Sequence, residues 1–308
     1  MEEKVYIFGH KNPDTDAIAS AIAMENLENK LGNTNAKAFR LGNINKETEF
    51  ALNTFKIMIP ELIESIPEGA NVILTDHNSF AQSINGIEKS KIQKVVDHHN
   101  ITEFQTKEPL YYIALPVGCT CTVIYGLYQL NNIEISQSLA GIMLSAIISD
   151  TLLFKSPTCT KKDIEVANKL ASIAEVDINA YGLEMLKAGT DLSSYSANDL
   201  INIDSKEFTA NDTKIQIAQV NTIDYNDVLK NKSDIEFAMN TFIEQNNIDL
   251  FILAITDILN NDSKVLVLGK RTDIVEKGFN VILEDNLALL PGVVSRKKQI
   301  VPVVLANA

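Results

Sequence analysis

The chain is poor in cysteine and in long apolar runs. Its 308 residues include only three cysteines, Cys119, Cys121 and Cys159. An odd number of cysteines does not make a disulfide framework, so we expect reduced thiols in a cytoplasmic protein. No stretch approaches the ~20 apolar residues of a membrane span, and the first residues lack the basic segment and apolar core of a signal peptide. These absences predict a protein without a membrane partner.

Positive charge is also scarce. Lys and Arg number 27 against 40 Asp and Glu, which gives a formal net charge of −13 at pH 7. Proteins that bind nucleic acid need a basic face, because the neutralisation of phosphates supplies most of their affinity. We therefore expect no nucleic-acid partner. An acidic protein whose ligand is a small polyanion must instead hold it with metal ions and a few well-placed cations.

Apolar runs typical of strands alternate with helical patterns through the first 188 residues. The strand patterns cover residues 4–8, 36–41, 71–75, 94–96 and 111–115. The helical patterns cover residues 14–31, 47–57, 120–129, 136–149, 161–175 and 179–187. This alternation predicts an α/β fold, in which a parallel sheet is covered by helices on both faces.

The pattern changes after residue 188. Residues 189–196 (GTDLSSYS) are polar and weakly patterned, which predicts a hinge linker between residues 1–188 and residues 197–308. The second segment predicts a smaller α/β domain, with strands at 214–220, 250–256 and 264–268 and a mostly helical stretch at 223–247. Residues 299–305 have an ambiguous pattern. The chain is long enough for two domains with separate cores.

Candidate metal ligands stand at the ends of these apolar runs. They are His10, Asp14 and Asp16 after the first run, Asp76 after the run 71–75, Asp97 and His98 after 94–96, and Asp150 at the end of the apolar helix 142–148. Ligands of open α/β sheets bind at the carboxyl ends of the strands. Carboxylates outnumber imidazoles and no thiolate is present, which favours Mn²⁺, Mg²⁺ or Co²⁺ over Zn²⁺. Four Asp and two His can hold two cations, and two such cations imply phosphoryl chemistry.

Several of these residues also have a structural interpretation. An isolated Asp at the end of an element is usually a turn or cap residue, which applies to Asp76 and Asp150 taken alone. Asp14 could serve only as the N-cap of its helix. Asp97 directly precedes two histidines and could orient His98 instead of binding metal.

The remaining histidines and cysteines are given other roles. All four histidines lie within the first hundred residues, at the ends of predicted strands. His77 is interpreted as a surface residue or as one that orients a ligand. Cys119 and Cys121 are not expected to form a zinc site, because no further Cys or His stands at a spacing that would complete it.

The motifs together resemble a known family. Residues 10–16 (HKNPDTD) and 97–99 (DHH) resemble the DHH phosphoesterase superfamily, and the wider match resembles the family II, manganese-dependent inorganic pyrophosphatases. The wider match includes residues 75–78, 116–120, 149–158, 205–208 and 295–299, so the resemblance covers nearly the whole chain. It implies a DHH catalytic domain followed by a DHHA2-like substrate-binding domain, and a homodimer formed through the N-terminal domain.

The resemblance implies hydrolysis of inorganic pyrophosphate to two phosphates. It implies two Mn²⁺ per subunit, with Co²⁺ or Mg²⁺ as substitutes, additional Mg²⁺ arriving with the substrate, and a metal-bridging hydroxide that attacks phosphorus between the two domains. One ion would be held by His10, Asp14, Asp76 and Asp150, and the other by Asp16, Asp76, His98 and Asp150. His99 and Asp97 would be the catalytic residues, and His99 would donate a hydrogen bond or a proton to the substrate. Lys206, Arg296 and Lys297 would hold the phosphate oxygens.

The basic cluster at residues 295–298 could instead be a solvated run of charge, the usual interpretation of adjacent cations. A turn at Pro291-Gly292 and the apolar tail after the cluster favour a placed site. A short-chain exopolyphosphatase, or another DHH phosphodiesterase, remains the alternative enzyme. The phosphodiesterase branch typically carries a Gly-Gly-Gly-His stretch, which this chain lacks, and no aromatic platform for bases is present. A third possibility is a metal or phosphate sensor without activity.

Overall fold

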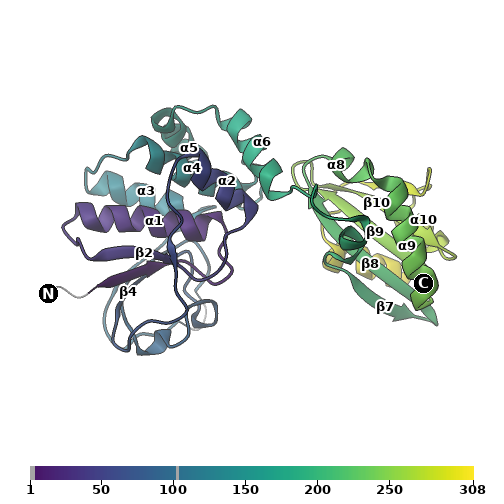
Figure 1. The fold of residues 1–308 in the computed structure, drawn as a ribbon, viewed down its shortest axis with the longest axis horizontal. Coiled ribbons are helices and arrows are strands. Elements are labelled where there is room, and N and C mark those ends of the chain that lie inside the picture. Colours follow the sequence, from purple (N-terminus) through teal and green to yellow (C-terminus); the bar gives the residue numbers. More distant parts are fainter. Residues whose placement is uncertain (1–3, 102–103) are drawn as a thin grey trace. The chain divides into compact units, whose positions relative to one another are not determined.

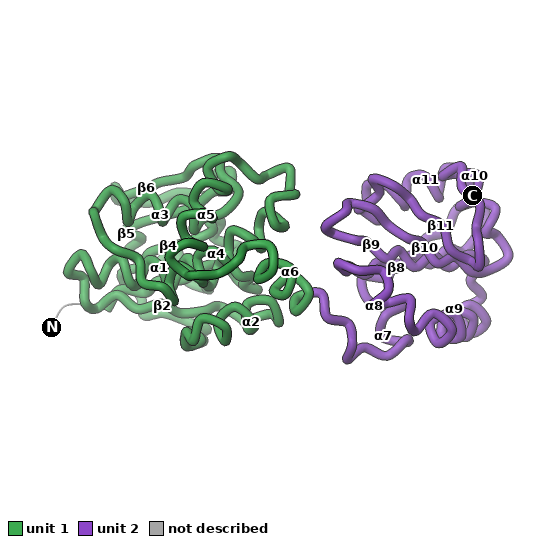
Figure 2. The backbone as a smooth tube through the Cα atoms, turned by 90° about the horizontal axis from the view of Figure 1, so that it is seen from above, with its two compact units in different colours: residues 1–189 green, residues 190–308 purple. Residues whose placement is uncertain are grey.

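The computed structural model describes residues 4–101 and 104–308. The chain divides into two compact units, unit 1 (residues 1–189) and unit 2 (residues 190–308), each with its own sheet. Figure 2 shows the two units in different colours. Both contain strands and helices, so the α/β class predicted from the sequence is confirmed.

Unit 1 is built on a six-stranded parallel sheet with the strand order β3-β2-β1-β4-β5-β6. The strands are β1 (Val5–Phe8), β2 (Ala36–Arg40), β3 (Glu61–Leu62), β4 (Asn71–Thr75), β5 (Lys91–Asp97) and β6 (Tyr111–Ala114). All five pairs of neighbouring strands run parallel. Five of these strands coincide with predicted apolar runs, and only the two-residue β3 was not predicted. The central strands β1, β4 and β5 therefore end side by side at one edge of the sheet.

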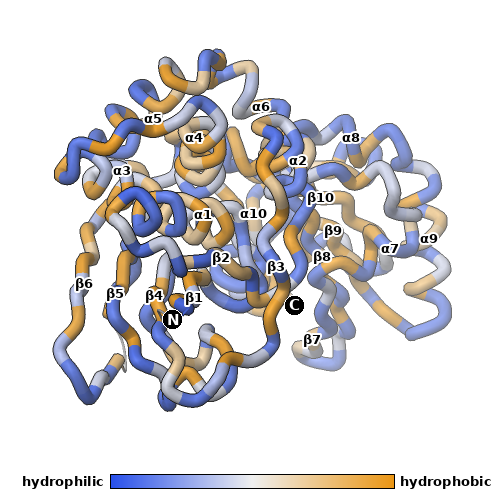
Figure 3. The backbone as a smooth tube through the Cα atoms, turned by 60° about the vertical axis from the view of Figure 1, so that its left-hand side comes forward, coloured by the Kyte–Doolittle hydropathy of each residue, from blue (hydrophilic) through white to orange (hydrophobic). Residues whose placement is uncertain are grey.

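The α-helices of unit 1 are α1 (Thr15–Lys30), α2 (Lys46–Thr54), α3 (Thr120–Leu130), α4 (Gln137–Thr151), α5 (Lys161–Ala174) and α6 (Ile178–Gly189). Helices α1 and α3 pack on the sheet, and α4 packs against α1 as a second layer, as Figure 1 shows. Helix α4 is buried along most of its length, which explains its almost uniformly apolar sequence, visible in Figure 3.

Helical segments cover both faces of the sheet, but unequally. Alternate strand residues such as Phe8, Leu74 and Val95 point away from α1 and form a core with Ile84 and Ile87. This second face is covered by loops and by two short 3₁₀ helices, η1 (Phe80–Gln82) and η2 (Ile87–Lys89). The predicted parallel sheet is confirmed, but among the described residues the α-helices lie on one face and only two 3₁₀ turns and loops cover the other.

Unit 2 contains a five-stranded mixed sheet with the order β11-β10-β9-β8-β7. Its strands are β7 (Lys206–Ala210), β8 (Thr213–Thr222), β9 (Leu250–Asp257), β10 (Asp262–Gly269) and β11 (Leu287–Leu290). Only β8 and β9 pair in parallel. The sequence predicted the three central strands and missed the two edge strands. Strand β7 (KEFTA) is largely polar and exposed, and β11 (LALL) is an apolar run of only four residues.

Helices cover both faces of this second sheet. Helices α7 (Ala197–Asn202), α8 (Tyr225–Leu229) and α9 (Lys232–Asn246) contribute to one core, and α10 (Asp273–Phe279) and α11 (Val301–Ala306) to the other. The ambiguous residues 299–305 end a π-helical turn, η3 (Arg296–Ile300), and continue into α11. Among the described residues, no helix combines the length and the apolar character that crossing a membrane requires.

Candidate metal centre

The candidate ligands of unit 1 gather at the carboxyl edge of the parallel sheet. His10 follows β1, Asp76 directly follows β4, and His98 directly follows β5. The remaining ligands come from helices: Asp14 and Asp16 lie at the start of α1, and Asp150 lies in the last turn of α4. These predicted residues are far apart in the sequence, and the fold brings them together.

One group of donors consists of His10, Asp14 and Asp76, whose ligand atoms lie within 4.8 Å of one another. His10 Nε2 lies 3.4 Å from Asp14 Oδ2 and 3.4 Å from Asp76 Oδ2. His10 Nδ1 donates to the carbonyl oxygen of Lys11 at 2.8 Å. Because the carbonyl can only accept, the proton is on Nδ1, and Nε2 is the nitrogen available to a cation.

A second group consists of Asp16, His98 and Asp150, again with ligand atoms within 4.8 Å of one another. His98 Nε2 lies 3.9 Å from Asp150 Oδ2 and 3.4 Å from Asp76 Oδ1. His98 Nδ1 donates to the Val117 carbonyl at 3.1 Å, so its Nε2 is free in the same way. Asp76 therefore presents one carboxylate oxygen to each group and lies between them.

The backbone holds Asp76 in this place. Asp76 adopts a positive φ of 57° and its backbone N–H donates to the Val96 carbonyl at 3.0 Å. A left-handed conformation is uncommon for a residue other than glycine and is often found at functional sites. Asp14 also caps α1, because its side chain accepts from Ala17 N at 2.9 Å. The cap interpretation and the ligand position of Asp14 are thus compatible.

Asp16 is fixed by the start of α3, a connection that the sequence did not reveal. Its two oxygens accept from the backbone N–H groups of Thr120 at 2.6 Å and Cys121 at 3.2 Å. The Thr120 hydroxyl also donates to Asp76 Oδ1 at 3.0 Å. Thr120 therefore holds two candidate ligands at once. It lies in the matched segment 116–120, but no rule of spacing identifies such a role.

The electrostatics of the group fit divalent cations. Burial raises the pKa of Asp16 to about 7 and also raises the pKa of Asp150, and neighbouring carboxylates add to both effects. Burial opposes charge on His10, but its interactions with Asp14 and Asp76 outweigh this and raise its pKa to about 11. Asp16 and Asp150 thus bind protons more readily than usual, and His10 holds its proton more firmly, where no cation balances the crowded carboxylates. An oxygen-rich donor set with free Nε2 atoms suits Mn²⁺, Mg²⁺ or Co²⁺.

His99 is oriented by Asp97, which is fully buried. Asp97 Oδ1 accepts from His99 Nδ1 at 2.9 Å and from the backbone N–H groups of His98 and His99. Its other oxygen accepts from Asn78 Nδ2 at 2.7 Å. Asp97 therefore positions the ring of His99, whereas it contacts only the backbone of His98. Half of the His99 side chain is exposed, which leaves its Nε2 accessible.

His77 and the cysteines do not join the predicted ligand set. His77 is buried, so the surface interpretation is wrong, and burial lowers its pKa to about 4. Its Nδ1 donates to the Thr75 carbonyl at 2.8 Å. All three cysteines are free thiols, as predicted. The thiols of Cys119 and Cys121 nevertheless come within 4.8 Å of an Asp16 oxygen, which the sequence did not predict.

The predicted phosphate-binding residues lie in unit 2. Lys206 begins β7 and is exposed, and Lys297 is exposed in η3. Arg296 is buried: its Nη2 donates to Asp204 Oδ1 at 2.7 Å and its backbone N–H donates to Gln219 Oε1 at 2.9 Å. Arg296 is therefore not part of a solvated run of charge, in contrast to Lys297 and Lys298.

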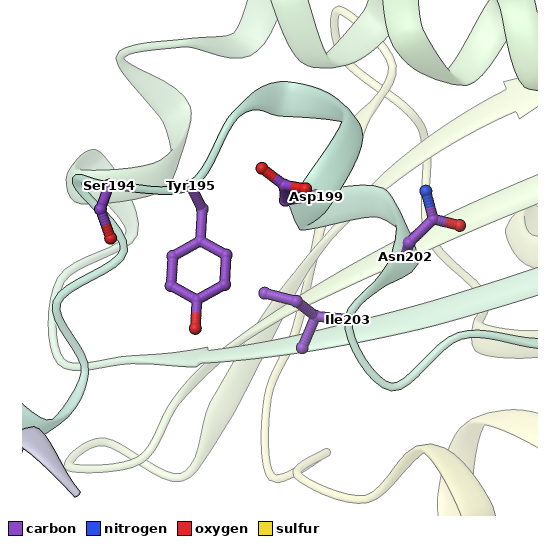
Figure 4. Close-up of a pocket in the computed structure, with 5 residues that line it drawn as sticks. All are labelled: Ser194, Tyr195, Asp199, Asn202 and Ile203. Carbon is purple, nitrogen blue, oxygen red and sulfur yellow. The ribbon is translucent and has the colours of Figure 1, made fainter.

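Unit 2 also has a pocket of ≈ 380 Å³, which Figure 4 shows in close-up. It is lined by Ser194, Tyr195, Asp199, Asn202 and Ile203. Asp199 is engaged in the capping box of α7 with Ser196, and no cationic side chain lines the pocket. We do not assign the candidate chemistry to this pocket, because it offers no cation to phosphate and its one carboxylate serves as a helix cap.

Comparison with known proteins shows to which family this chain is similar. The N-terminal domain of the DHH family matches residues 4–147, and the DHHA2 domain matches residues 183–307. The manganese-dependent inorganic pyrophosphatase of Bacillus subtilis is 55% identical over 302 residues, which cover 98% of this chain and 97% of that protein. A relative from Exiguobacterium sp. with the corresponding name is 56% identical over 97% of this chain and 96% of its own length.

This chain belongs to the manganese-dependent inorganic pyrophosphatase family. A Methanococcus jannaschii protein assigned to the family II inorganic pyrophosphatases has a solved structure with a TM-score of 0.64, 43% identity and coverage of 98% of this chain and 99% of that one. An exopolyphosphatase-related protein from Bacteroides fragilis has a TM-score of 0.51 at 14% identity, covering 99% of this chain and 91% of that one, and so shares the fold alone. The resemblance found in the sequence to the pyrophosphatase family is confirmed.

Proposed function

We propose that this chain is a manganese-dependent inorganic pyrophosphatase that hydrolyses pyrophosphate to two phosphates. The observation that carries the proposal is Asp76, whose two oxygens face two separate groups of donors. A carboxylate in this position can bridge two cations, as sites with two metal ions require. Membership of the pyrophosphatase family supports the substrate.

The predicted ligand assignment is retained as a proposal. One Mn²⁺ would be held by His10, Asp14, Asp76 and Asp150, and the other by Asp16, Asp76, His98 and Asp150. Such cations, when bound, would neutralise charge on phosphate oxygens and make a bound water molecule more acidic, which is the chemistry that hydrolysis needs. Co²⁺ or Mg²⁺ can substitute, and the substrate brings further Mg²⁺.

The chain's own residues then bind and orient the substrate. Asp97 keeps the proton of His99 on Nδ1, so a protonated His99 ring can donate from Nε2 to a phosphate oxygen. We propose that Lys206, Arg296 and Lys297 of unit 2 bind the phosphate groups of a substrate held at the metal centre. The guanidinium of Arg296 matches two phosphate oxygens, provided that phosphate replaces Asp204 as its partner.

We further propose the predicted organisation, with residues 1–188 as the catalytic domain, residues 189–196 as a hinge and residues 197–308 as the substrate-binding domain. We also propose a cytoplasmic homodimer formed through the N-terminal domain. In support of the dimer, β6 lies at an edge of the sheet, where no described residue pairs with its outer side, and Tyr111 and Leu115 are exposed there.

Phosphate release from pyrophosphate tests the function. The chain is stripped of metal with a chelator and then supplied with Mn²⁺, Co²⁺, Mg²⁺ or Zn²⁺ in turn. We expect no turnover without metal and the fastest turnover with Mn²⁺. Tripolyphosphate and a short oligonucleotide, assayed in parallel, test the exopolyphosphatase and phosphodiesterase alternatives. Full activity in excess chelator, or a preference for either alternative substrate, would contradict the proposal.

A further inference from the structure

Glu47 connects the two segments that carry helical metal ligands. It lies in the first turn of α2, and its Oε1 accepts a hydrogen bond from Thr15 Oγ1 at 3.0 Å and a short one from Ser149 Oγ. Thr15 stands between the two candidate ligands at the start of α1, and Ser149 directly precedes the candidate ligand at the end of α4. A single oxygen atom thus receives one hydrogen bond from each segment.

The capping of α2 does not explain this arrangement. The N-cap residue Asn45 performs that function, because its side chain accepts from Thr48 N at 2.7 Å. The hydroxyl of Thr15 also lies 3.0 Å from the hydroxyl of Thr48, and both threonines are fully buried. Glu47 is therefore a half-buried carboxylate in contact with the buried hydroxyl of Thr15, whereas Glu49 in the same turn is exposed.

The space around the other carboxylate oxygen is also restricted. A Cβ atom at Gly189, the last residue of α6, would lie 2.9 Å from Glu47 Oε2 and 2.9 Å from Glu47 Cβ. Any larger residue at position 189 would force Glu47 to move. The backbone of α6 thus closes one side of Glu47, which keeps its other oxygen directed at Thr15 and Ser149.

We propose that Glu47 is a positioning residue that fixes the ligands of α1 relative to the ligand of α4 and thereby raises the affinity for Mn²⁺. The inference rests on the proposed metal centre, because only a centre with ligands from both helices needs their separation to be fixed. Glu47 acts through Thr15 and Ser149, whose neighbours in the chain supply the donors. Loss of a residue that orients metal ligands typically lowers metal affinity 10–100-fold.

Binding of Mn²⁺ to the full chain tests the proposal, with free Mn²⁺ measured by electron paramagnetic resonance. We expect Glu47→Ala to weaken the binding of at least one Mn²⁺ by about tenfold. Glu47→Gln keeps an oxygen that can accept both hydrogen bonds, so its affinity should stay close to that of the unmodified chain. Glu49→Ala, which removes an exposed carboxylate from the same turn, is the matched control and should change nothing.

Unchanged Mn²⁺ affinity in Glu47→Ala would overturn the proposal. Equal losses of Mn²⁺ affinity in Glu47→Gln and Glu47→Ala would overturn it too, because the oxygen that accepts the hydrogen bonds would then have no effect. If Glu47→Ala does not fold, Ser149→Ala removes only one of the two hydrogen bonds. Ser149→Ala should therefore weaken Mn²⁺ binding by less than about tenfold. Unchanged Mn²⁺ affinity in Ser149→Ala would also overturn the proposal. Failure of the proposed function would look different, because the unmodified chain itself would then not bind two Mn²⁺ ions.

Discussion

The two units differ in how firmly they hold the side chains that are candidates for ligand binding. In unit 1 the candidate metal ligands are held by backbone contacts, as in the two N–H groups that donate to Asp16 and the carbonyls that accept from His10 and His98. In unit 2 the candidate phosphate-binding cations are either exposed, as Lys206 and Lys297 are, or paired with an acid.

The difference corresponds to the ligands that each unit is proposed to bind. A metal centre needs several donors at fixed positions before the ion arrives, because each misplaced donor lowers the affinity. A phosphate group can be met by long cationic side chains that adjust to it, and Lys is a flexible point charge. Unit 1 is therefore expected to respond to substitution more steeply than unit 2.

The largest effect is expected from Asp76→Asn. The change keeps the size of the side chain and tolerates the positive φ, but it removes the charge that faces both donor groups. We expect the activity with Mn²⁺ to fall by more than ~100-fold. This loss exceeds the roughly 10–100-fold decrease that is typical when a residue that orients a metal ligand is removed. Phosphate release from pyrophosphate measures the loss. Glu165→Gln, in an exposed ion pair on α5, is the control, and a comparable loss there would show that the effect is not specific to the centre.

A second prediction concerns pH and the metal-free chain. The pKa of Asp16 is raised from 3.8 to about 7, so its protonated form contributes stability that is lost as pH rises from about 4 to 7. The pKa of His98 is raised from 6.5 to about 9, because its contacts with Asp76 and Asp16 outweigh burial. Its contribution is complete below pH 6.5 and is lost as pH rises towards 9. Both groups therefore destabilise the metal-free fold as pH rises.

Mn²⁺ replaces these protons, so its stabilising effect should grow with pH. We expect the increase in melting temperature on adding Mn²⁺ to be larger at pH 8 than at pH 6, by several degrees. Scanning calorimetry of the same sample with chelator and with Mn²⁺ measures it. The same increase at both pH values would contradict a centre built on Asp16 and His98.

The sequence predicted the parallel sheet and the gathering of the candidate ligands at its edge, because both depend on local pattern. Apolar runs mark β1, β4 and β5, and polar residues directly after them must lie at the edge of the sheet. The strands of the mixed sheet in unit 2 were harder to predict. Strand β7 pairs on one side only, and its exposed residues do not alternate clearly with apolar ones. An edge strand is defined by its partner and has little signal of its own.

Contacts between distant segments could not be predicted in the same way. The roles of Thr120 and Glu47 depend on which helices pack together, and neither residue differs in sequence from an ordinary helical Thr or Glu. The burial of Arg296 depends likewise on Asp204, 92 positions earlier in the chain. The sequence favoured a placed basic cluster at residues 295–298 and the family resemblance gave Arg296 a role, but neither predicts the ion pair.

A smaller effect is expected in unit 2 from Arg296→Ala. If the guanidinium binds phosphate both before and during the reaction, its loss should raise KM and lower kcat together, by about tenfold each. Arg296→Lys keeps the charge but loses the forked donor, so it should recover only part of the activity. Lys298→Ala, an exposed neighbour without an assigned role, is the control. A fall in kcat with unchanged KM would assign Arg296 to the transition state alone.

The smallest effect is expected from Asp204→Asn. Arg296 must exchange Asp204 for phosphate, so the ion pair competes with substrate. The Asp204 side chain is 58% exposed, and ion pairs with an exposed partner contribute at most ~1 kcal/mol, or about fivefold in an equilibrium constant. We therefore expect KM for pyrophosphate to fall by about two- to fivefold with kcat little changed. A rise in KM would show instead that Asp204 holds Arg296 in the orientation that phosphate needs, and unit 2 would then be as preorganised as unit 1.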